Sequence, residues 1–296
     1  LGTIPQGPAQ AVPSPCHLLT SNLDSPARRG YYTPMPLLDP AAVAAQLHTT
    51  TLGHPLSLHA RVASTQEIAR AAAQAGAAEG LAVVAAQQTA GRGRGARTWW
   101  SPQDGGLYLS LLLRPALPAT HIAWVTMALS LGAAEAINQL YGVEVGIKWP
   151  NDLQWHGRKL AGVLAEGAFL GNRLDYVVAG IGINLAVDFS TQPELVDIAV
   201  SLHQAADQAI DAAALLAALL HRTEHHYHLL QAGHSPLPAW KERLHTLGQP
   251  VTATGANGET ITGTAHDVEA DGALRIALPD GGWRLIRAGD VSLRSV

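Results

Sequence analysis

A short segment rich in glycine and arginine carries the clearest chemical signal in the sequence. Between residues 91 and 97 the chain reads GRGRGAR. Glycine has no Cβ, so the backbone of such a segment can come close to a ligand. Arginine adds planar, permanently charged donors that suit phosphate and carboxylate oxygens. The segment therefore predicts a loop that binds an anionic ligand.

The spacing of these residues excludes two common phosphate-binding motifs and leaves two other interpretations open. The segment contains no Walker pattern and lacks the dinucleotide-binding fingerprint. A solvated basic turn and an Arg-Gly segment that binds RNA both fit so short a run. RNA binding would also need aromatic platforms, for which Trp99 and Trp100 are the nearby candidates.

Four further motifs follow or precede the Gly/Arg segment in a fixed order. They are Ser64-Thr65, then KWPNDL at residues 148–153, RKLAGVL at 158–164 and GIGIN at 180–184. Together with the Gly/Arg segment, this order resembles the biotin–protein ligases, also called holocarboxylase synthetases. The resemblance covers roughly residues 50 to 296.

The resemblance implies an enzyme that works in two steps. Biotin and ATP would form biotinyl-5′-AMP and pyrophosphate, and the biotinyl group would then pass to a lysine of a biotin carboxyl carrier protein. Both steps require positioning and the neutralisation of negative charge. The implied small molecules are biotin, ATP and Mg²⁺.

The resemblance also assigns roles to individual residues. The biotin-binding set is Ser64, Thr65, Gln88, Gly91, Arg92, Arg94, Lys159, Gly162, Gly180 and Gly182. The ATP-binding set is Arg92, Arg94, Arg97, Trp99, Asn151, Lys159 and Asn184. The catalytic set is Lys159, Arg94 and Asp152, with no protein metal site beyond the Mg²⁺ that accompanies ATP. Lys159 would bridge the biotin carboxylate and the α-phosphate.

Structural interpretations of the same residues remain open on sequence alone. Ser64 with Glu67 has the spacing of a capping box, so the hydroxyl could serve only to start a helix. Asn151 and Asp152 follow a proline and suit a turn. Lys159 could be an edge residue whose ammonium reaches solvent.

The Gly/Arg segment departs from the usual family pattern GRGRRGR at two positions. Gly95 replaces an arginine and Ala96 replaces a glycine, which puts loop dynamics and retention of the adenylate in question. In addition, Gln66 stands where an asparagine is common.

Three alternative functions share some of these sequence features. Lipoate ligases and octanoyl transferases share the catalytic architecture, but they lack the KWPND motif with an SH3-like tail. The transferases also need a cysteine nucleophile, and Cys16 lies in a proline-rich tail. An RNA-binding protein is the alternative that is not an enzyme, and a DNA-binding repressor would need a helix-turn-helix that residues 1–40 do not suggest.

The bulk composition is that of a globular protein with a local rather than a general basic function. The chain has 296 residues, 47% of them hydrophobic and 14% charged, and a net charge of −4. That charge argues against wrapping nucleic acid by bulk electrostatics. One cysteine and the lack of a long apolar run predict a cytoplasmic protein without a membrane span. The first residue is Leu1, which leaves the true start of the chain open.

Periodicity and turn signals predict an α+β fold in three parts. Residues 1–40, with eight prolines, form an N-terminal extension, 41–246 a catalytic domain, and 247–296 an SH3-like β-barrel. The catalytic domain should hold a mixed sheet with helices on one side, as in class II synthetases and biotin ligases. Predicted helices span 41–47, 64–76, 120–140, 193–204, 212–230 and 236–245, and predicted strands span 55–62, 81–86, 107–113, 143–148, 159–169 and 176–187. Short strands at 251–254, 259–267, 273–278 and 283–288 complete the barrel.

Two open points concern partners and metals. A homodimer is possible, but the sequence does not place its interface. His221 and His225 share a helical face, where a polar surface is a better interpretation than a zinc site.

Overall fold

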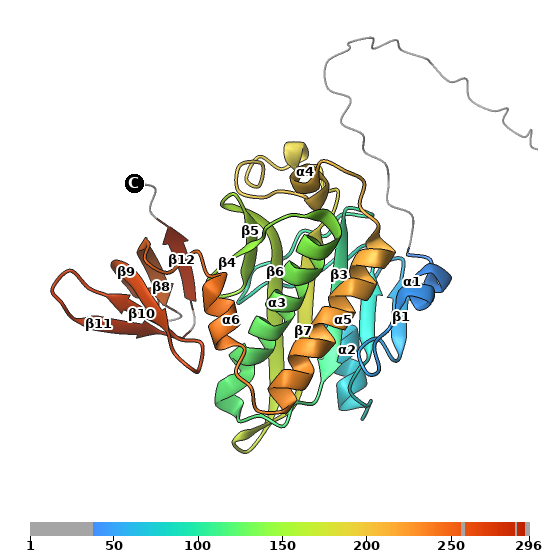
Figure 1. Ribbon diagram of the computed structural model, residues 1–296, viewed down its shortest axis with the longest axis horizontal. Helices are drawn as coiled ribbons and strands as arrows, with labels where there is room; N and C mark the ends of the chain where they lie inside the picture. Colours follow the sequence, from blue (N-terminus) through green and yellow to red (C-terminus); the bar gives the residue numbers. More distant parts are fainter. Residues whose placement is uncertain (1–37, 256–257, 288, 294–296) are drawn as a thin grey trace, which may run out of the picture. The chain divides into compact units, whose positions relative to one another are not determined.

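A seven-stranded mixed sheet forms the centre of the computed structural model, which describes residues 38–255, 258–287 and 289–293 (Figure 1). The strand order is β1-β2-β3-β7-β6-β5-β4, in which β1 and β2 are parallel and all other neighbours are antiparallel. The strands are β1 (Leu56–His59), β2 (Ala82–Ala85), β3 (Gly106–Leu113), β4 (Gly146–Lys148), β5 (Asp152–Trp155), β6 (Arg158–Leu170) and β7 (Arg173–Asn184). The predicted mixed α+β fold is confirmed.

The two long helices cover one face of this sheet. Helices α3 (Ile122–Tyr141) and α5 (Ala212–Gln231) lie side by side across the strands (Figure 1). Because successive strand residues point to opposite faces, Leu107, Leu109, Leu111 and Leu113 of β3 all join the main core with these helices. Gly142, at φ 66°, ends α3 in a left-handed cap.

A shorter helix covers part of the opposite face, so the prediction of helices on one side is wrong in this respect. Helix α2 (Thr65–Gln74) packs its small residues Ala69 and Ala73 against Val83, Leu112 and Val178 in a separate cluster. Strand β3 explains the difference, since all of its residues are buried and the strand must therefore be covered on both faces.

The predicted helix over 193–204 is also wrong. Only α4 (Leu202–Ala206) is helical, and it begins after Ser201, which forms a capping box with Gln204. The segment before it bonds to β6 instead: Lys159 N–H donates to Ile198 O at 2.7 Å, and Val200 N–H donates to Lys159 O at 3.0 Å. Residues 193–198 thus form turns, and the bridge between Ala199 and Lys159 ends them before a regular helix begins.

Strand β5 was missed by the sequence-based prediction. It pairs with both β4 and the start of β6, and His156 and Gly157 form the tight turn between β5 and β6 with φ angles of 46° and 76°. Two consecutive positive φ angles are typical of a type I′ hairpin. Consequently Asp152 begins a strand and does not belong to a free turn.

The C-terminal region forms a second, antiparallel sheet with the order β11-β10-β9-β8-β12. Its strands are β8 (Pro250–Gly255), β9 (Thr260–Val268), β10 (Leu274–Ala277), β11 (Trp283–Ile286) and β12 (Gly289–Leu293). The first four match the predicted short strands, and β12 adds a fifth. The indole of Trp149 donates to Gly272 O at 3.0 Å, and that of Trp124 donates to Ala270 O at 2.8 Å, so both sheets share contacts.

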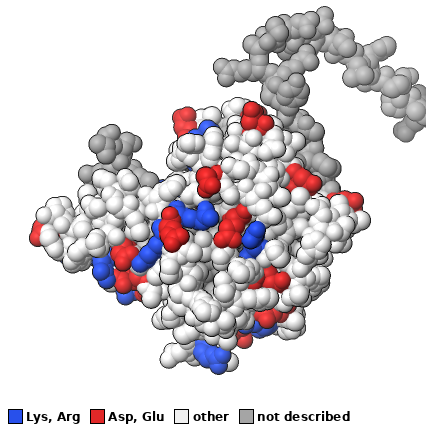
Figure 2. Space-filling model, viewed as in Figure 1, with Lys and Arg blue, Asp and Glu red and all other residues white. Residues whose placement is uncertain are grey.

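The remaining short elements are α1 (Pro40–Gln46), α6 (Leu237–Glu242) and the 3₁₀ turns η1 (Ala119–His121) and η2 (Phe189–Thr191). Most of the predicted extension, and with it the expectation about DNA binding, lies outside the described residues. In the part of the chain that is described, no helix has the length and hydropathy needed to cross a membrane. On the face shown in Figure 2, basic side chains lie beside acidic ones and most of the surface is uncharged.

Candidate active site

A pocket opens on the face of the sheet opposite α3 and α5. The period-two geometry of strands places Ser110 of β3, Gly162 of β6, and Gly180 and Gly182 of β7 on this face. It also gathers residues far apart in the sequence. The predicted site residues that line it are Ser64, Thr65, Gln88, Arg92, Arg94, Arg97, Trp99, Asn151, Asp152, Lys159, Gly162, Gly180 and Gly182.

The start of α2 forms one polar end of the pocket. Ser64 is the N-cap, but its hydroxyl makes no capping bond, so the predicted capping box is wrong. The first free N–H of the helix, that of Thr65, donates instead to Gln88 Oε1 at 2.9 Å, and Thr65 Oγ1 donates to the same oxygen at 3.1 Å. Ser64 is 1% exposed, and its Oγ has no partner among the described residues. A buried hydroxyl of this kind is costly unless a ligand satisfies it.

Two residues that sequence reasoning did not assign close the same end. Ser110 Oγ donates to Gln66 Oε1 at 2.9 Å, and Gln66 Nε2 donates to Val178 O at 2.9 Å. Gln66 is 4% exposed and Ser110 is 1% exposed. The signal for Ser110 was present, because it is the one serine inside a strand rich in leucine.

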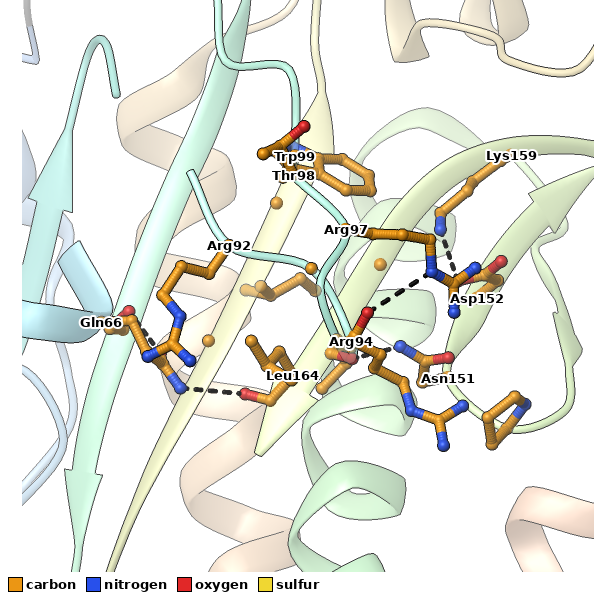
Figure 3. Close-up of a pocket in the computed structure, with 18 of the residues that line it drawn as sticks. Gln66, Arg92, Arg94, Arg97, Thr98, Trp99, Asn151, Asp152, Lys159 and Leu164 are labelled. Atoms are coloured by element: carbon orange, nitrogen blue, oxygen red, sulfur yellow. Dashed lines mark hydrogen bonds and ion pairs between the residues drawn. The ribbon is translucent and has the colours of Figure 1, made fainter. Parts of the chain in front are cut away.

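A lysine and a carboxylate form the other end. Lys159 Nζ lies 2.7 Å from Asp152 Oδ1, and Figure 3 shows the two side chains pointing toward each other. The backbone of Lys159 is held by the bonds to residues 198 and 200 described above, so the side chain starts from a rigid strand. Lys148, which the sequence analysis left unassigned, is the register partner of Asp152 and also lines the pocket.

The Gly/Arg segment folds as a hairpin loop at the pocket. Trp99 N–H donates to Gly91 O and Gly93 N–H donates to Arg97 O, each at 2.9 Å. At the tip, Gly95 has φ 63°, which glycine adopts without the steric cost that an arginine would pay. The first departure from the family pattern therefore suits this loop conformation.

The indole of Trp99 lies on the sheet within the pocket. A Cβ on Gly182 would come within 2.5 Å of Trp99 Nε1, and a Cβ on Gly162 would come within 2.9 Å of the same ring. Lys159 Nζ is 5.1 Å from the ring centroid, a cation–π distance. In this structure the two glycines thus make room for Trp99, whereas the sequence analysis had expected them to make room for biotin.

The three arginines of the loop reach different ends of the pocket (Figure 3). Arg92 points toward Gln66, and its Nη2 lies 2.9 Å from Glu166 Oε1. Arg94 and Arg97 lie on the side of Asn151 and Asp152. The structure thus separates Arg92 from the Lys159 end, although the sequence analysis had assigned it to both biotin and ATP.

Two predicted residues do not line the pocket. Gly91 lies at the base of the loop, where a Cβ would come within 2.5 Å of Trp99 O. Asn184 Nδ2 donates to the backbone oxygens of Lys159 and Val200, each at 3.3 Å. Asn184 therefore fixes the strand that carries Lys159.

The charge of the pocket favours an anionic ligand. Three arginines, two lysines and one aspartate line it. Asp152 is the carboxylate that could help hold Mg²⁺, which typically takes one or two protein carboxylates together with nucleotide phosphates. No group of three or more His, Cys, Asp or Glu side chains within the described ranges is placed to hold a metal by itself.

Comparisons with known proteins identify the family. Residues 58–184 match the Biotin/lipoate A/B protein ligase family, and residues 246–294 match the Biotin protein ligase C terminal domain. The chain is 32% identical over 265 residues to the biotin--[acetyl-CoA-carboxylase] ligase of Mycobacterium tuberculosis, covering 86% of this chain and 96% of that protein. It belongs to the biotin protein ligase family.

Further relatives agree with this assignment. The bifunctional ligase/repressor BirA of Bacillus subtilis is 35% identical over 250 residues, which cover 83% of this chain and 76% of that protein. Among solved structures, the biotin protein ligase of Aquifex aeolicus in complex with biotin and ATP matches with a TM-score of 0.68 and 28% identity, over 84% of this chain and all of that one.

Proposed function

We propose that this biotin protein ligase activates biotin with ATP and transfers it to a lysine of a biotin carboxyl carrier domain. In the first step a carboxylate oxygen of biotin attacks the α-phosphorus of ATP. The bond from that phosphorus to the bridging oxygen breaks, and pyrophosphate leaves. In the second step the acceptor amine attacks the acyl carbon of biotinyl-5′-AMP, AMP leaves, and the amine loses a proton as the amide forms.

The single observation that carries this proposal is the Lys159–Asp152 pair at one end of a pocket whose other end has the unsatisfied hydroxyl of Ser64. Biotin is polar at both ends, with a ureido ring that hydrogen-bonds and a carboxylate that reacts. A pocket with hydroxyl and amide groups at one end and cations at the other is complementary to that molecule.

Each group at the cationic end has a distinct task. Lys159 provides a compact positive charge between the biotin carboxylate and the α-phosphate, which would otherwise repel each other. Arg94 and Arg97 reach the same end from the loop and can hold phosphate oxygens through charged hydrogen bonds. Asp152 orients the Lys159 ammonium, and its second oxygen is available to Mg²⁺ or to the acceptor amine.

The loop protects the intermediate. Biotinyl-5′-AMP is a mixed anhydride that water hydrolyses, so its protein must exclude water until the acceptor arrives. Trp99 of the hairpin already lies over the sheet beside Lys159. Movement of this indole would admit substrate and then cover it.

The test is a pyrophosphate-release assay with ATP and Mg²⁺, run with biotin and separately with lipoate. We expect release that depends on biotin, is far slower with lipoate and is lost on addition of a chelator. Equal release with both acids would favour the lipoate ligase alternative, and no release with biotin would reject the proposal.

Several broader features belong to the same proposal. Residues 41–246 would form the catalytic domain and 247–296 the C-terminal domain. The protein would act in the cytoplasm on a carrier domain of acetyl-CoA carboxylase or a related carboxylase, without binding DNA. Strand β1 ends the large sheet, and this edge offers backbone groups to a second copy in a homodimer.

A further inference from the structure

A carboxylate outside the pocket is connected to the Gly/Arg loop. Glu166 lies on β6, beyond the part of that strand which pairs with β5. Its Oε1 is 2.9 Å from Arg92 Nη2, and its Oε2 is 2.5 Å from Arg70 Nη2. Each carboxylate oxygen therefore has its own guanidinium, one from the loop and one from α2.

The side of Glu166 away from the loop is rigid. Arg70 belongs to α2, which packs on the sheet through Ala69 and Ala73. Gln66 Nε2 adds a contact of 3.3 Å to Glu166 Oε2 and is itself bonded to the backbone of β7. Glu166 is thus fixed by a strand and a helix, and only Arg92 among its three partners comes from the loop.

The Gly/Arg loop needs a contact with a rigid residue such as Glu166 to stay folded. Gly91, Gly93 and Gly95 fall within five residues, and glycine loses more conformational entropy on ordering than any other residue. Inside the hairpin, Arg92 pairs with Thr98 in an isolated β-bridge, and the next residue is Trp99. Holding Arg92 therefore also holds its bridge partner Thr98, and with it the adjacent residue Trp99.

We propose that Glu166 is a positioning residue that keeps the Gly/Arg loop folded over the pocket by holding Arg92. Glu166 does not line the pocket, so it acts through the loop and not on the reacting atoms. Its consequence for catalysis, retention of the acyl-adenylate under Trp99, rests on the function proposed above. Its effect on the loop does not rest on that function.

The Arg92–Glu166 pair should be stronger than an ordinary surface ion pair because Glu166 also pairs with Arg70. Isolated exposed pairs often contribute little, but networks with several charged hydrogen bonds contribute more. The side chains of Arg92 and Glu166 are 34% and 29% exposed, so solvent screens them only in part. Loss of the Glu166 charge should therefore raise the population of the open loop by a measurable factor.

The experiment uses limited trypsin digestion of the full chain, because Arg94 and Arg97 are cleavage sites at the tip of the loop. Wild type is compared with Glu166→Gln, which keeps the shape and removes the charge. Asp175→Asn serves as the matched control, since it removes the exposed Arg114–Asp175 pair far from the loop. Arg92→Gln and the double variant complete a mutant cycle, and thermal melting confirms that each variant is folded.

We expect cleavage after Arg94 and Arg97, measured by mass spectrometry without substrates, to be about fivefold faster in Glu166→Gln and unchanged in Asp175→Asn. Arg92→Gln should match Glu166→Gln, and the double variant should be no faster than either. In the adenylation assay, Glu166→Gln should raise the KM for biotin about fivefold and leave kcat within about twofold, while the bound adenylate escapes faster.

Two outcomes would overturn the proposal. One is equal loop cleavage in wild type and Glu166→Gln, and the other is an additional increase from Glu166→Gln in the Arg92→Gln background. If Glu166→Gln fails to fold, Arg92→Gln alone gives the same test from the loop side. If biotin and ATP fail to protect the wild-type loop, the proposed function is rejected while the comparison without substrates still decides the role of Glu166.

Discussion

Two single residues, at opposite ends of one pocket, have the most distinct roles in the site. Lys159 faces a carboxylate and approaches an indole, and Ser64 offers a hydroxyl that nothing in the described chain satisfies. The first is placed for charge neutralisation and the second for ligand recognition. Because these roles differ, substitutions at the two positions should affect different kinetic parameters.

Removal of the Lys159 charge should slow the chemical step. We expect Lys159→Ala to lower kcat for biotin-dependent pyrophosphate release by about 10²- to 10³-fold, as is typical when one electrostatic contact to the transition state is lost. Lys241→Ala, which removes a lysine cation from α6, should leave the rate unchanged. A Lys159→Ala enzyme with the wild-type rate would exclude the lysine from catalysis.

Removal of the Ser64 hydroxyl should weaken biotin binding without loss of stability. We expect Ser64→Ala to raise the KM for biotin about three- to tenfold, the effect of one hydrogen bond, and to leave the melting temperature unchanged or slightly higher. Steady-state kinetics and thermal melting measure the two quantities. A lower melting temperature with an unchanged KM would show that the hydroxyl is structural.

At the element scale, the sequence predicted those features that depend on local pattern. The turns at Asp271-Gly272 and Asp280-Gly281 and the long helices α3 and α5 are marked by Asx-Gly pairs and apolar periodicity, and they occur where expected. The sequence could not predict that Gln88 would satisfy the first N–H of α2, because that bond joins residues 23 positions apart. For the same reason it missed the extended pairing of residues 198–200 with Lys159, which replaced a helix.

In the candidate site, too, the sequence predicted what depends on local motifs and missed what depends on contacts between distant segments. Motif order located most of the lining residues, since those motifs lie at strand ends, in the Gly/Arg loop or at the start of α2. It could not locate Glu166 or Gln66, whose roles arise from contacts between α2, β6 and the loop. The indole of Trp99 on Gly182 is likewise a contact between distant segments that residue types alone do not specify.

An acidic side chain also fixes the segment before β1 to helix α5. Glu224 is 6% exposed and accepts the backbone N–H groups of Thr50, Thr51 and Leu52. Burial alone would raise the pKa of this carboxyl, but the three donors outweigh burial and the pKa is lowered. Because the folded-state pKa lies below the unfolded value, this stabilisation is present above pH 4.5 and is lost as the pH falls through the folded-state pKa.

We therefore expect Glu224→Gln to destabilise the protein by about 1–3 kcal/mol at pH 7. The amide offers only one acceptor oxygen, and its NH₂ group would face backbone N–H groups that are also donors. The difference from wild type should shrink as the pH is lowered from 4.5 through the folded-state pKa of Glu224. Urea unfolding over a pH series measures this. A difference that does not depend on pH would show that the carboxylate charge is not the stabilising feature.

At the scale of the whole molecule, the two sheets share a hydrophobic cluster. Met127 and Leu131 of α3 and Trp149 lie in one cluster with Val251, Leu274 and other residues of the C-terminal sheet. Val291 of β12 also lines the active-site pocket. The C-terminal region is thus part of the scaffold that holds the site.

Trp240 of α6 tests this coupling. It is 1% exposed within the shared cluster, and truncation of a buried aromatic side chain typically costs about 3–5 kcal/mol. We expect Trp240→Ala to lower the stability by that amount and to shift the loss of adenylation activity and the loss of secondary structure to the same lower urea concentration. Separate transitions for the two signals would mean that the sheets unfold independently.

The most direct test of the central claim follows the biotinyl group itself. The protein is incubated with biotin, Mg²⁺ and ATP labelled at the α-phosphate, separated from free nucleotide, and then mixed with a biotin carboxyl carrier domain. We expect label to stay bound only with biotin, and to leave as AMP in proportion to the biotin that mass spectrometry finds on one carrier lysine. Label retained equally with lipoate, or no biotin on the carrier, would show that the protein is not a biotin ligase.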